Sequence, residues 1–224
     1  MLKKLVIAID GPAASGKSTT SKLVAERLGY LYIDTGAMYR AITWKVIRNK
    51  IDLEETDIIG ELAERTSVRL EKANDEIKVF LDGEDVSKEI RTQEVTGAVS
   101  AVSAIEKVRT VMVREQRKIG ECGGVVVDGR DIGTVVFPNA DVKIFMIADV
   151  EERARRRQKE LERAGATVDL SKLVEEIVTR DKKDSGRNIS PLRKADDAIA
   201  LDTTDLTIDE QVDFIVKKVF ERLG

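Results

Sequence analysis

Short, unbroken apolar runs recur along the chain, separated by stretches with helical periodicity. The first run covers 5–9 and ends at Asp10, and a Gly/Pro/Ser loop and a helical pattern over 18–28 follow it. Further apolar runs cover 31–33, 125–127, 142–147 and 198–201. Unbroken runs are typical of strands buried on both faces, and their alternation with helices is typical of a parallel sheet. We therefore predict a three-layer α/β fold with a five-stranded parallel sheet flanked by helices.

The segment from about 63 to 95 has a different pattern. Apolar and polar residues tend to alternate over 68–70, 77–81 and 84–86, with turn-forming residues at 73–75 and 82–83. Alternation with period two across such turns predicts a small antiparallel β insert within the α/β frame. From the residues alone, this insert is equally well read as surface decoration or as a flap that closes on a substrate.

A complete G-x-x-x-x-G-K-[ST] motif occupies 11–18, between the first predicted strand and the first predicted helix. Its glycines let successive backbone amides point at phosphate oxygens, and the helix N-terminus favours the anion. We expect Lys17 to lie on a solvated loop and to contact the β- and γ-phosphates, and Ser18 to ligate Mg²⁺. The predicted ATP-binding residues are Gly11, Pro12, Ala13, Ala14, Ser15, Gly16, Lys17, Ser18 and Thr19.

Composition narrows the chemistry that this loop can serve. The 224-residue chain is 42% hydrophobic and has a net charge of −3, which argues against a nucleic-acid coat or a membrane-surface helix. It has no histidine and a single cysteine, Cys122, which excludes imidazole general bases, Cys-rich zinc sites and intrachain disulfides. The apolar run near the start is too short for a signal peptide or a membrane span, so we expect a cytoplasmic protein.

The string Asn49-Lys50-Ile51-Asp52 matches the N-K-x-D motif with which GTPases read guanine. In a GTPase this motif follows a buried strand late in the chain. Here it follows the helical stretch 41–47 and lies close behind the phosphate loop. We therefore interpret it as the end of a helix and a chance match.

Charged residues follow the predicted strands, where parallel sheets bind their ligands. The segments 34–40 and 128–134 begin at the ends of the second and third strands. Arg40, Arg109 and Arg130 can supply forked donors to a phosphate dianion. Asp128 ends a buried strand and is placed to hold the Mg²⁺ shell.

Two later segments carry clustered charges. Arg153, Arg156 and Arg157 share one face of a predicted helix that follows Asp149, which predicts a helical lid over about 149–166. The partners that helical spacing offers are exposed acidic residues, so we expect the lid to be mobile until ATP binds. They are Asp149 for Arg153, Glu152 and Glu160 for Arg156, and Glu160 for Arg157. Further on, Arg180 and Asp184 lie one turn apart and could be an ordinary helix ion pair.

The segments 34–40, 128–134, 151–157 and 180–187, together with 83–87 and 90–92 in the insert, closely resemble those of the bacterial cytidylate kinases of the nucleoside monophosphate kinase superfamily. The resemblance runs from Ile9 to Asp202. It implies one domain over 1–224, a monomer, an acceptor-side position for the insert, and transfer of the γ-phosphoryl group of ATP, with Mg²⁺, to CMP or dCMP. The implied catalytic residues are Lys17, Asp128, Arg130, Arg153 and Arg157. The implied CMP-binding residues are Thr35, Arg40, Ser100, Arg109, Arg130, Asp131, Arg180, Asp184 and Arg187.

By the same resemblance, Asp131 and the Thr35 hydroxyl face the cytosine amine, while Arg109 faces the base's acceptors. Arg180, Asp184 and Ser100 would contact the sugar, and Arg187 the base or phosphate. Many relatives carry serine where Thr35 stands, but the hydroxyl is retained. Two alternatives stay open: a kinase for another acceptor, such as UMP, AMP or a small metabolite, and a switch or binding module that hydrolyses its nucleotide slowly.

Overall fold

The computed structural model describes residues 4–73, 76–163 and 165–224. Two compact units make up the chain: unit 1 comprises Met1–Tyr32 and Gly123–Gly224, and unit 2 comprises Ile33–Cys122. Within the described ranges, no helix combines the length and apolar character needed to cross a bilayer.

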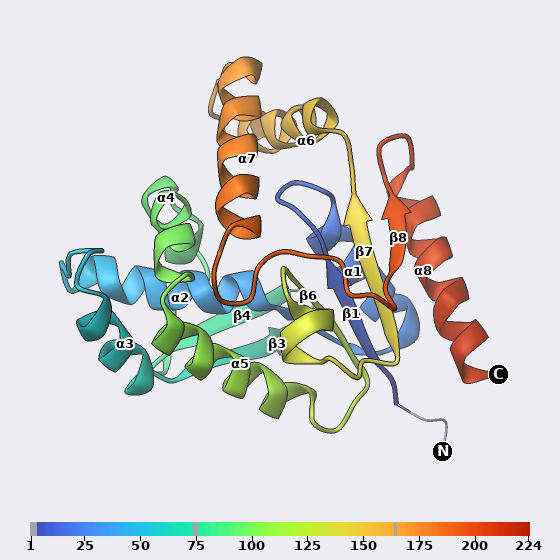
Figure 1. Cartoon of the computed structure of the whole chain (residues 1–224), viewed down its shortest axis with the longest axis horizontal. Helices are drawn as coiled ribbons and strands as arrows, with labels where there is room; N and C mark the ends of the chain where they lie inside the picture. Colours follow the sequence, from blue (N-terminus) through green and yellow to red (C-terminus); the bar gives the residue numbers. More distant parts are fainter. Residues whose placement is uncertain (1–3, 74–75, 164) are drawn as a thin grey trace. The chain divides into compact units, whose positions relative to one another are not determined.

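A five-stranded sheet runs through the described residues in the order β2-β6-β1-β7-β8, of which Figure 1 labels β6, β1, β7 and β8. The strands are β1 (Val6–Asp10), β2 (Leu31–Asp34), β6 (Val125–Gly129), β7 (Val142–Ile147) and β8 (Ile199–Asp202). Parallel ladders join β1 to β6 and β7, and β7 to β8. The predicted strands and their parallel arrangement are confirmed, and the unbroken apolar runs are explained by burial: Ile7, Ile9 and Val126 have no exposed surface.

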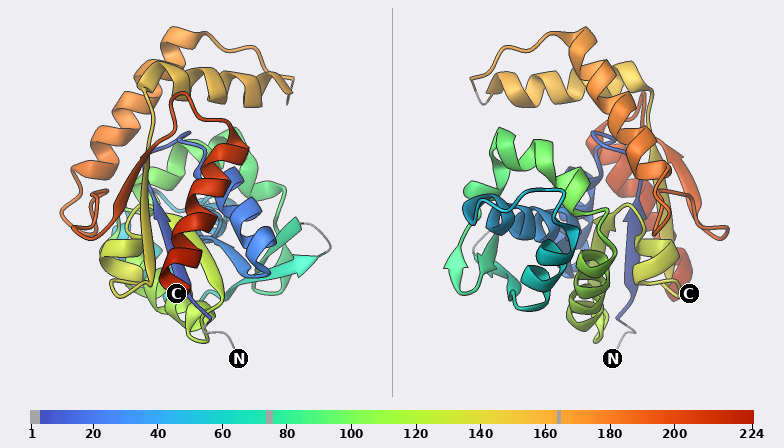
Figure 2. Two further views of the ribbon diagram at one scale, coloured as in Figure 1. Left: turned by 90° about the vertical axis from the view of Figure 1, so that its right-hand side faces the viewer. Right: turned by 60° about the vertical axis from the view of Figure 1, so that its left-hand side comes forward.

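The helices of unit 1 are α1 (Lys17–Leu28), α6 (Val150–Arg163), α7 (Leu170–Ser185) and α8 (Ile208–Leu223), with a short π-helical turn η2 (Ile132–Val136). Helices α1 and α8 pack together, as do α6 and α7, which Figure 2 shows crossing each other. Ala154, Leu173 and Ile177 form the buried contact between α6 and α7. The predicted lid therefore corresponds to α6, and α7 lies directly against it.

Unit 2 contains the predicted insert. Its helices are α2 (Thr35–Arg48), α3 (Thr56–Glu64), η1 (Glu89–Arg91), α4 (Gln93–Val102) and α5 (Glu106–Gly120), and its strands are β3 (Val68–Ala73), β4 (Glu76–Leu81) and β5 (Glu84–Asp85). The strands pair antiparallel in the order β3-β4-β5, as predicted. Asp82 and Gly83 both have positive φ, 51° and 92°, which a two-residue hairpin turn of type I′ requires. The other predicted turn, at 73–75, includes 74 and 75, which lie outside the described residues.

Helix α2 is longer than the helical pattern over 41–47 indicated. It begins at Thr35, immediately after β2, because the Asp34 carboxylate accepts a hydrogen bond from the Ala37 amide at 2.9 Å and caps the helix. It ends at Arg48, and Lys50 has a positive φ of 55°. This geometry confirms that the N-K-x-D string is the end of a helix.

Candidate active site

The phosphate loop connects β1 to α1 in a conformation that depends on two glycines. Gly11 has φ 151° and lies so close to β7 that a Cβ atom there would be 2.2 Å from the Met146 carbonyl oxygen. Gly16 has φ 90° and precedes the first turn of α1. Ser15 is fully buried, and its hydroxyl donates to the Pro12 carbonyl at 3.1 Å, which closes the loop. The glycines thus let the backbone turn and approach its neighbours as a phosphate cradle requires.

Lys17 is buried, which corrects the expectation of a solvated side chain. Its ammonium group donates to the Pro12 carbonyl at 2.5 Å and to the Ser15 hydroxyl at 3.2 Å. Burial lowers the pKa of Lys17 well below its ordinary value, and the nearby charge of Arg130 lowers it further. A cation held at this cost is suited to phosphate oxygens, which would supply the negative charge that the loop lacks.

Ser18 and Asp128 lie side by side at the carboxyl end of the sheet. The Ser18 hydroxyl donates to Asp128 Oδ2 at 2.8 Å, and the Tyr32 hydroxyl donates to Asp128 Oδ1 at 3.1 Å. Within the described ranges, no group of three or more Asp, Glu or Cys side chains forms a complete metal cage. One hydroxyl and one carboxylate nevertheless fit Mg²⁺, because this ion is held by few protein ligands and completes its shell with water and substrate phosphates.

Asp184 lies between two arginines from different parts of unit 1. Arg130, at the end of β6, donates from Nε to Asp184 Oδ2 at 2.9 Å, and Arg187 pairs with Asp184 Oδ1. Burial alone would raise the pKa of Asp184, but Arg130 and Arg187 outweigh it, with a smaller contribution from Arg180, so this pKa lies below its usual value. Asp184 is therefore more than an ordinary partner of Arg180 within α7.

The three arginines of α6 lie in three different environments, although the sequence places them on one face. Arg153 is buried and donates to the Ala148 carbonyl at 3.1 Å, to the Ala13 carbonyl of the phosphate loop at 3.2 Å, and to Asp181 Oδ2 on α7 at 2.7 Å. The prediction of a weak, exposed ion pair between Arg153 and Asp149 is wrong. Asp149 instead accepts a hydrogen bond from the Glu151 amide at 2.8 Å, in the first turn of α6. Arg153 thus fixes the base of the predicted lid.

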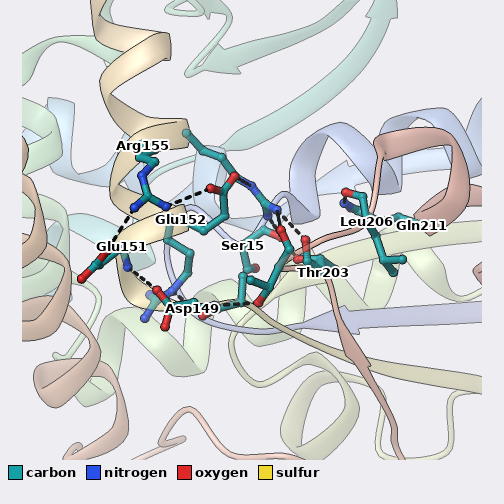
Figure 3. A network of polar contacts seen from close by, with 12 residues as sticks. Ser15, Asp149, Glu151, Glu152, Arg155, Thr203, Leu206 and Gln211 are labelled. Carbon is teal, nitrogen blue, oxygen red and sulfur yellow. Dashed lines mark hydrogen bonds and ion pairs between the residues drawn. The ribbon is translucent and has the colours of Figure 1, made fainter.

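Arg156 and Arg157 also lie in different environments: Arg156 belongs to a network of hydrogen bonds, and Arg157 lies on the helix surface. Arg156 donates to Glu152, to the Thr203 hydroxyl at 3.1 Å and to backbone carbonyls at 203 and 204, and Figure 3 shows Glu152, Ser15 and Thr203 in this network. Thr203 is fully buried and also donates to the Ser15 carbonyl at 3.1 Å. Arg157 pairs with Glu160 on the helix surface at 3.0 Å. Of the three, Arg157 has the environment that the sequence analysis predicted for a mobile lid.

The acceptor residues predicted in unit 2 lie on three helices. Thr35 and Arg40 are on α2, where Arg40 lies 3.9 Å from the Asp34 carboxylate. Ser100 is on α4 and Arg109 on α5. Arg109 is buried, donates to the Ser103 carbonyl at 3.0 Å and lies over the Tyr39 ring at 5.3 Å. Asp131, in unit 1, is buried at the N-terminal end of η2.

Sequence reasoning did not find four residues that organise this region: Asp10, Tyr32, Asp181 and Thr203. Asp10 accepts hydrogen bonds from the Ile132 and Gly133 amides, Tyr32 contacts Asp128, Asp181 holds Arg153, and Thr203 links Arg156 to the phosphate loop. Only Asp10 carried a sequence signal, since an acidic residue that ends a buried strand lies at the ligand-binding edge of a parallel sheet.

A parallel sheet with a phosphate loop after its central strand, and a cluster of paired arginines beside that loop, defines a P-loop protein of the nucleoside monophosphate kinase class. The sequence agrees with this class: residues 7–221 match the protein family described as Cytidylate kinase. The chain belongs to the cytidylate kinase family. It is 53% identical over 222 residues to the cytidylate kinase of Bacillus subtilis (strain 168), covering 99% of both chains. It is 54% identical over 210 residues to that of Bacillus pumilus (strain SAFR-032), covering 94% of this chain and 93% of the relative.

A solved structure of an uncharacterized protein from Eubacterium ventriosum ATCC 27560 has a similar fold. The two match with a TM-score of 0.52 and 16% identity, covering 98% of this chain and 99% of the other. At this identity the likeness shows the fold alone.

Proposed function

We propose that the chain transfers the γ-phosphoryl group of ATP to CMP or dCMP, giving ADP and CDP or dCDP. One observation carries the proposal within unit 1: the end of β6 joins the phosphate loop to the arginine cluster. Asp128 accepts from Ser18 of the loop, and two residues later Arg130 donates to Asp184. A single strand end therefore holds groups suited to a nucleotide's phosphates beside groups suited to a second anion.

On the donor side, the residues from Gly11 to Thr19 would bind ATP, with Lys17 at the β- and γ-phosphates. Ser18, with Asp128, would hold Mg²⁺, which would help to neutralise the charge of the phosphates. Arg130, Arg153 and Arg157 would stabilise the charge on the transferred group. Phosphoryl transfer needs little covalent help, so alignment and charge neutralisation suffice in a chain without histidine.

On the acceptor side, the family resemblance assigns residues to each part of CMP. Arg40 and Arg130 would bind the monophosphate; Ser100, Arg180 and Asp184 would contact the sugar; and Arg187 would reach the base or phosphate. Thr35, Arg109 and Asp131 would read the cytosine edge. Uracil presents an acceptor where cytosine has its amine and a donor at N3, so Asp131 and Arg109 would penalise UMP by repulsion as well as by lost hydrogen bonds.

An acceptor panel with a coupled ADP assay tests the proposal. We expect turnover to be fastest with CMP and dCMP and much slower with UMP and AMP. If UMP, AMP or a small metabolite is phosphorylated faster than CMP, the protein is a kinase for that acceptor instead. If the rate of ADP release does not depend on any added acceptor, the protein is a slow nucleotide hydrolase. We further propose that the protein is a cytoplasmic monomer. Light scattering coupled to size-exclusion chromatography tests the oligomeric state.

A further inference from the structure

The last residue of β1, Asp10, forms a bridge to the segment that carries Arg130 and Asp131. Its Oδ1 atom accepts from the Ile132 amide at 2.8 Å, and its Oδ2 atom accepts from the Gly133 amide at 2.7 Å. These are the first two amides of η2, and Asp131 occupies the cap position just before them. A carboxylate from another strand, 122 residues away in sequence, thus supplies the cap of this short helix.

This bridge restrains the backbone on the C-terminal side of Asp131. On the N-terminal side, Asp128 is fixed by β6, in register with Ile9 of β1. Between these two anchors lie only Gly129, Arg130 and Asp131. The two hydrogen bonds of Asp10 therefore restrain the distance and orientation of Asp131 relative to the end of the sheet.

Asp10 lowers the stability of the folded protein, which is unfavourable for a purely structural bridge. Its side chain is buried, and its pKa is raised to about 7, chiefly by burial and to a smaller extent by the neighbouring charge of Asp131. The amides of Ile132 and Gly133 and the charge of Lys17 only partly counteract these effects. Burying a carboxylate in this way opposes folding, so these hydrogen bonds restrain the position of η2 at a cost in stability.

We propose that Asp10 is a positioning residue for acceptor recognition: by holding the first amides of η2, it fixes Asp131 where it reads the acceptor base. This inference rests on the proposed function, in which Asp131 faces the cytosine amine. Asp10 itself touches the backbone of η2, so it acts on the acceptor through Asp131.

The test compares Asp10→Asn with a matched control at the other end of the same strand. Asp141→Asn alters a bond of the same kind, from a backbone amide to an aspartate, since Asp141 Oδ2 accepts from the Val6 amide at 2.9 Å at the start of β1. Asparagine keeps the shape of the side chain but turns an amino group toward one of the two amide donors. Asp10→Ser, whose hydroxyl is too short to reach both amides, is the second variant should Asp10→Asn fail to accumulate as folded protein.

For Asp10→Asn we expect the KM for CMP to rise on the order of tenfold and the CMP/UMP ratio of kcat/KM to fall on the order of tenfold, because misplacing a recognition group weakens discrimination. The KM for ATP should change less than about threefold. Asp141→Asn should leave all three values at those of the wild type. Unchanged KM for CMP and unchanged CMP/UMP ratio in the folded Asp10→Asn and Asp10→Ser proteins would overturn the proposal.

Amide hydrogen exchange separates this inference from the proposed function, because it needs no acceptor. Exchange should accelerate in Asp10→Asn at whichever of the Ile132 and Gly133 amides loses its acceptor, and stay unchanged at both in Asp141→Asn. If the wild type does not phosphorylate CMP, the proposed function fails, and the kinetic comparison is made with the acceptor that the panel identifies. Slow exchange at both amides in Asp10→Asn would show that Asp10 does not hold η2 and would reject the inference for any acceptor.

Discussion

Arg153 donates from Nη1 to Asp181 Oδ2 at 2.7 Å, an ion pair that joins α6 to α7. The same Nη1 atom also donates to the Ala13 carbonyl in the phosphate loop. The side chain of Arg153 is 8% exposed and that of Asp181 is 23% exposed. Because the pair is largely shielded from water, each partner depends on the other for compensation of its charge. One buried arginine therefore couples the base of α6 to the loop that is proposed to bind ATP.

Asp181→Asn should destabilise the protein, because Arg153 would keep its buried charge while its partner loses one. We expect the free energy of unfolding to fall by about 1–3 kcal/mol, below the full cost of an orphaned buried charge because Asp181 is partly exposed. The KM for ATP should rise with it, since Arg153 also contacts the phosphate loop. Urea denaturation and steady-state kinetics measure the two effects.

Glu160→Gln is the matched control for this substitution. It removes the carboxylate that pairs with Arg157 on the same helix, where the two side chains are 57% and 36% exposed. Exposed pairs of this kind contribute about 0.3–0.5 kcal/mol, so the control should leave the free energy of unfolding nearly unchanged. Equal effects of the two substitutions would mean that the burial of the Arg153–Asp181 pair has no energetic consequence.

A second prediction concerns Lys17. Lys17→Met should reduce phosphoryl transfer by a factor on the order of 10²–10³ or more, because it removes the proposed cation at the transferred phosphate. Since burial holds the pKa of Lys17 well below its ordinary value, the charged form opposes folding at neutral pH. The melting temperature at pH 7 should therefore stay unchanged or rise. Loss of activity accompanied by a lower melting temperature would indicate a structural role in closing the loop.

The backbone of this fold could be predicted from the sequence because its signals are local. An unbroken apolar run such as 5–9 implies a doubly buried strand, the glycines of 11–16 imply the phosphate loop, and Asp82-Gly83 implies a tight turn. Each depends on residues adjacent in sequence, so one sequence is enough to read it. The five strands and the antiparallel insert follow from such signals.

The polar contacts of the site could not be predicted in the same way, because their partners are distant in sequence. Helical spacing offered Asp149 as the partner of Arg153, whereas packing of α7 on α6 brings in Asp181, 28 residues away. Asp10 ends an apolar run like any strand terminus, and only the fold places the Ile132 amide against it. Burial then changes the energetics of these groups, and burial of a charged side chain has no sequence pattern of its own.

A third prediction concerns Asp184 and the sugar. Asp184 accepts hydrogen bonds from both Arg130 and Arg187. Truncation to alanine would therefore release both arginines and lower activity with every acceptor nucleotide. Asp184→Asn keeps one acceptor oxygen and is the sharper test. If Asp184 contacts the ribose 2′-OH, the CMP/dCMP ratio of kcat/KM should fall about five- to twelvefold. This corresponds to about 1–1.5 kcal/mol, because the substitution replaces a hydrogen bond to a charged group by one to a neutral amide. Both acceptors should also lose activity through the displaced Arg130.

The control for the sugar prediction is Asp181→Asn, on the same helix. It should lower activity with CMP and dCMP equally, because Asp181 contacts Arg153 on the donor side. An Asp184→Asn protein whose CMP/dCMP ratio matches that of the wild type would restrict Asp184 to orienting Arg130 and Arg187. The acceptor panel with both nucleotides supplies all of these ratios.

The last prediction concerns the pH dependence of stability, which follows from Asp10. Burial raises its pKa in the folded protein to about 7, from an ordinary value of 3.8. A carboxyl group whose pKa rises on folding contributes stability that is fully present below the lower of these values and is lost as the pH rises through the upper one. The wild type should therefore lose stability relative to Asp10→Asn between about pH 4 and pH 8.

Between pH 5 and pH 8 the difference in unfolding free energy between Asp10→Asn and the wild type should shift by about 2–3 kcal/mol in favour of the variant. Urea denaturation at several pH values measures it, and other carboxylates cancel because both proteins contain them. Asp10→Asn would then be relatively more stable at pH 8 while binding CMP more weakly. A simple structural cap predicts the reverse, a variant less stable at every pH. A constant difference across this range would mean that Asp10 is already ionised at pH 5, and that the amides of Ile132 and Gly133 fully compensate its burial.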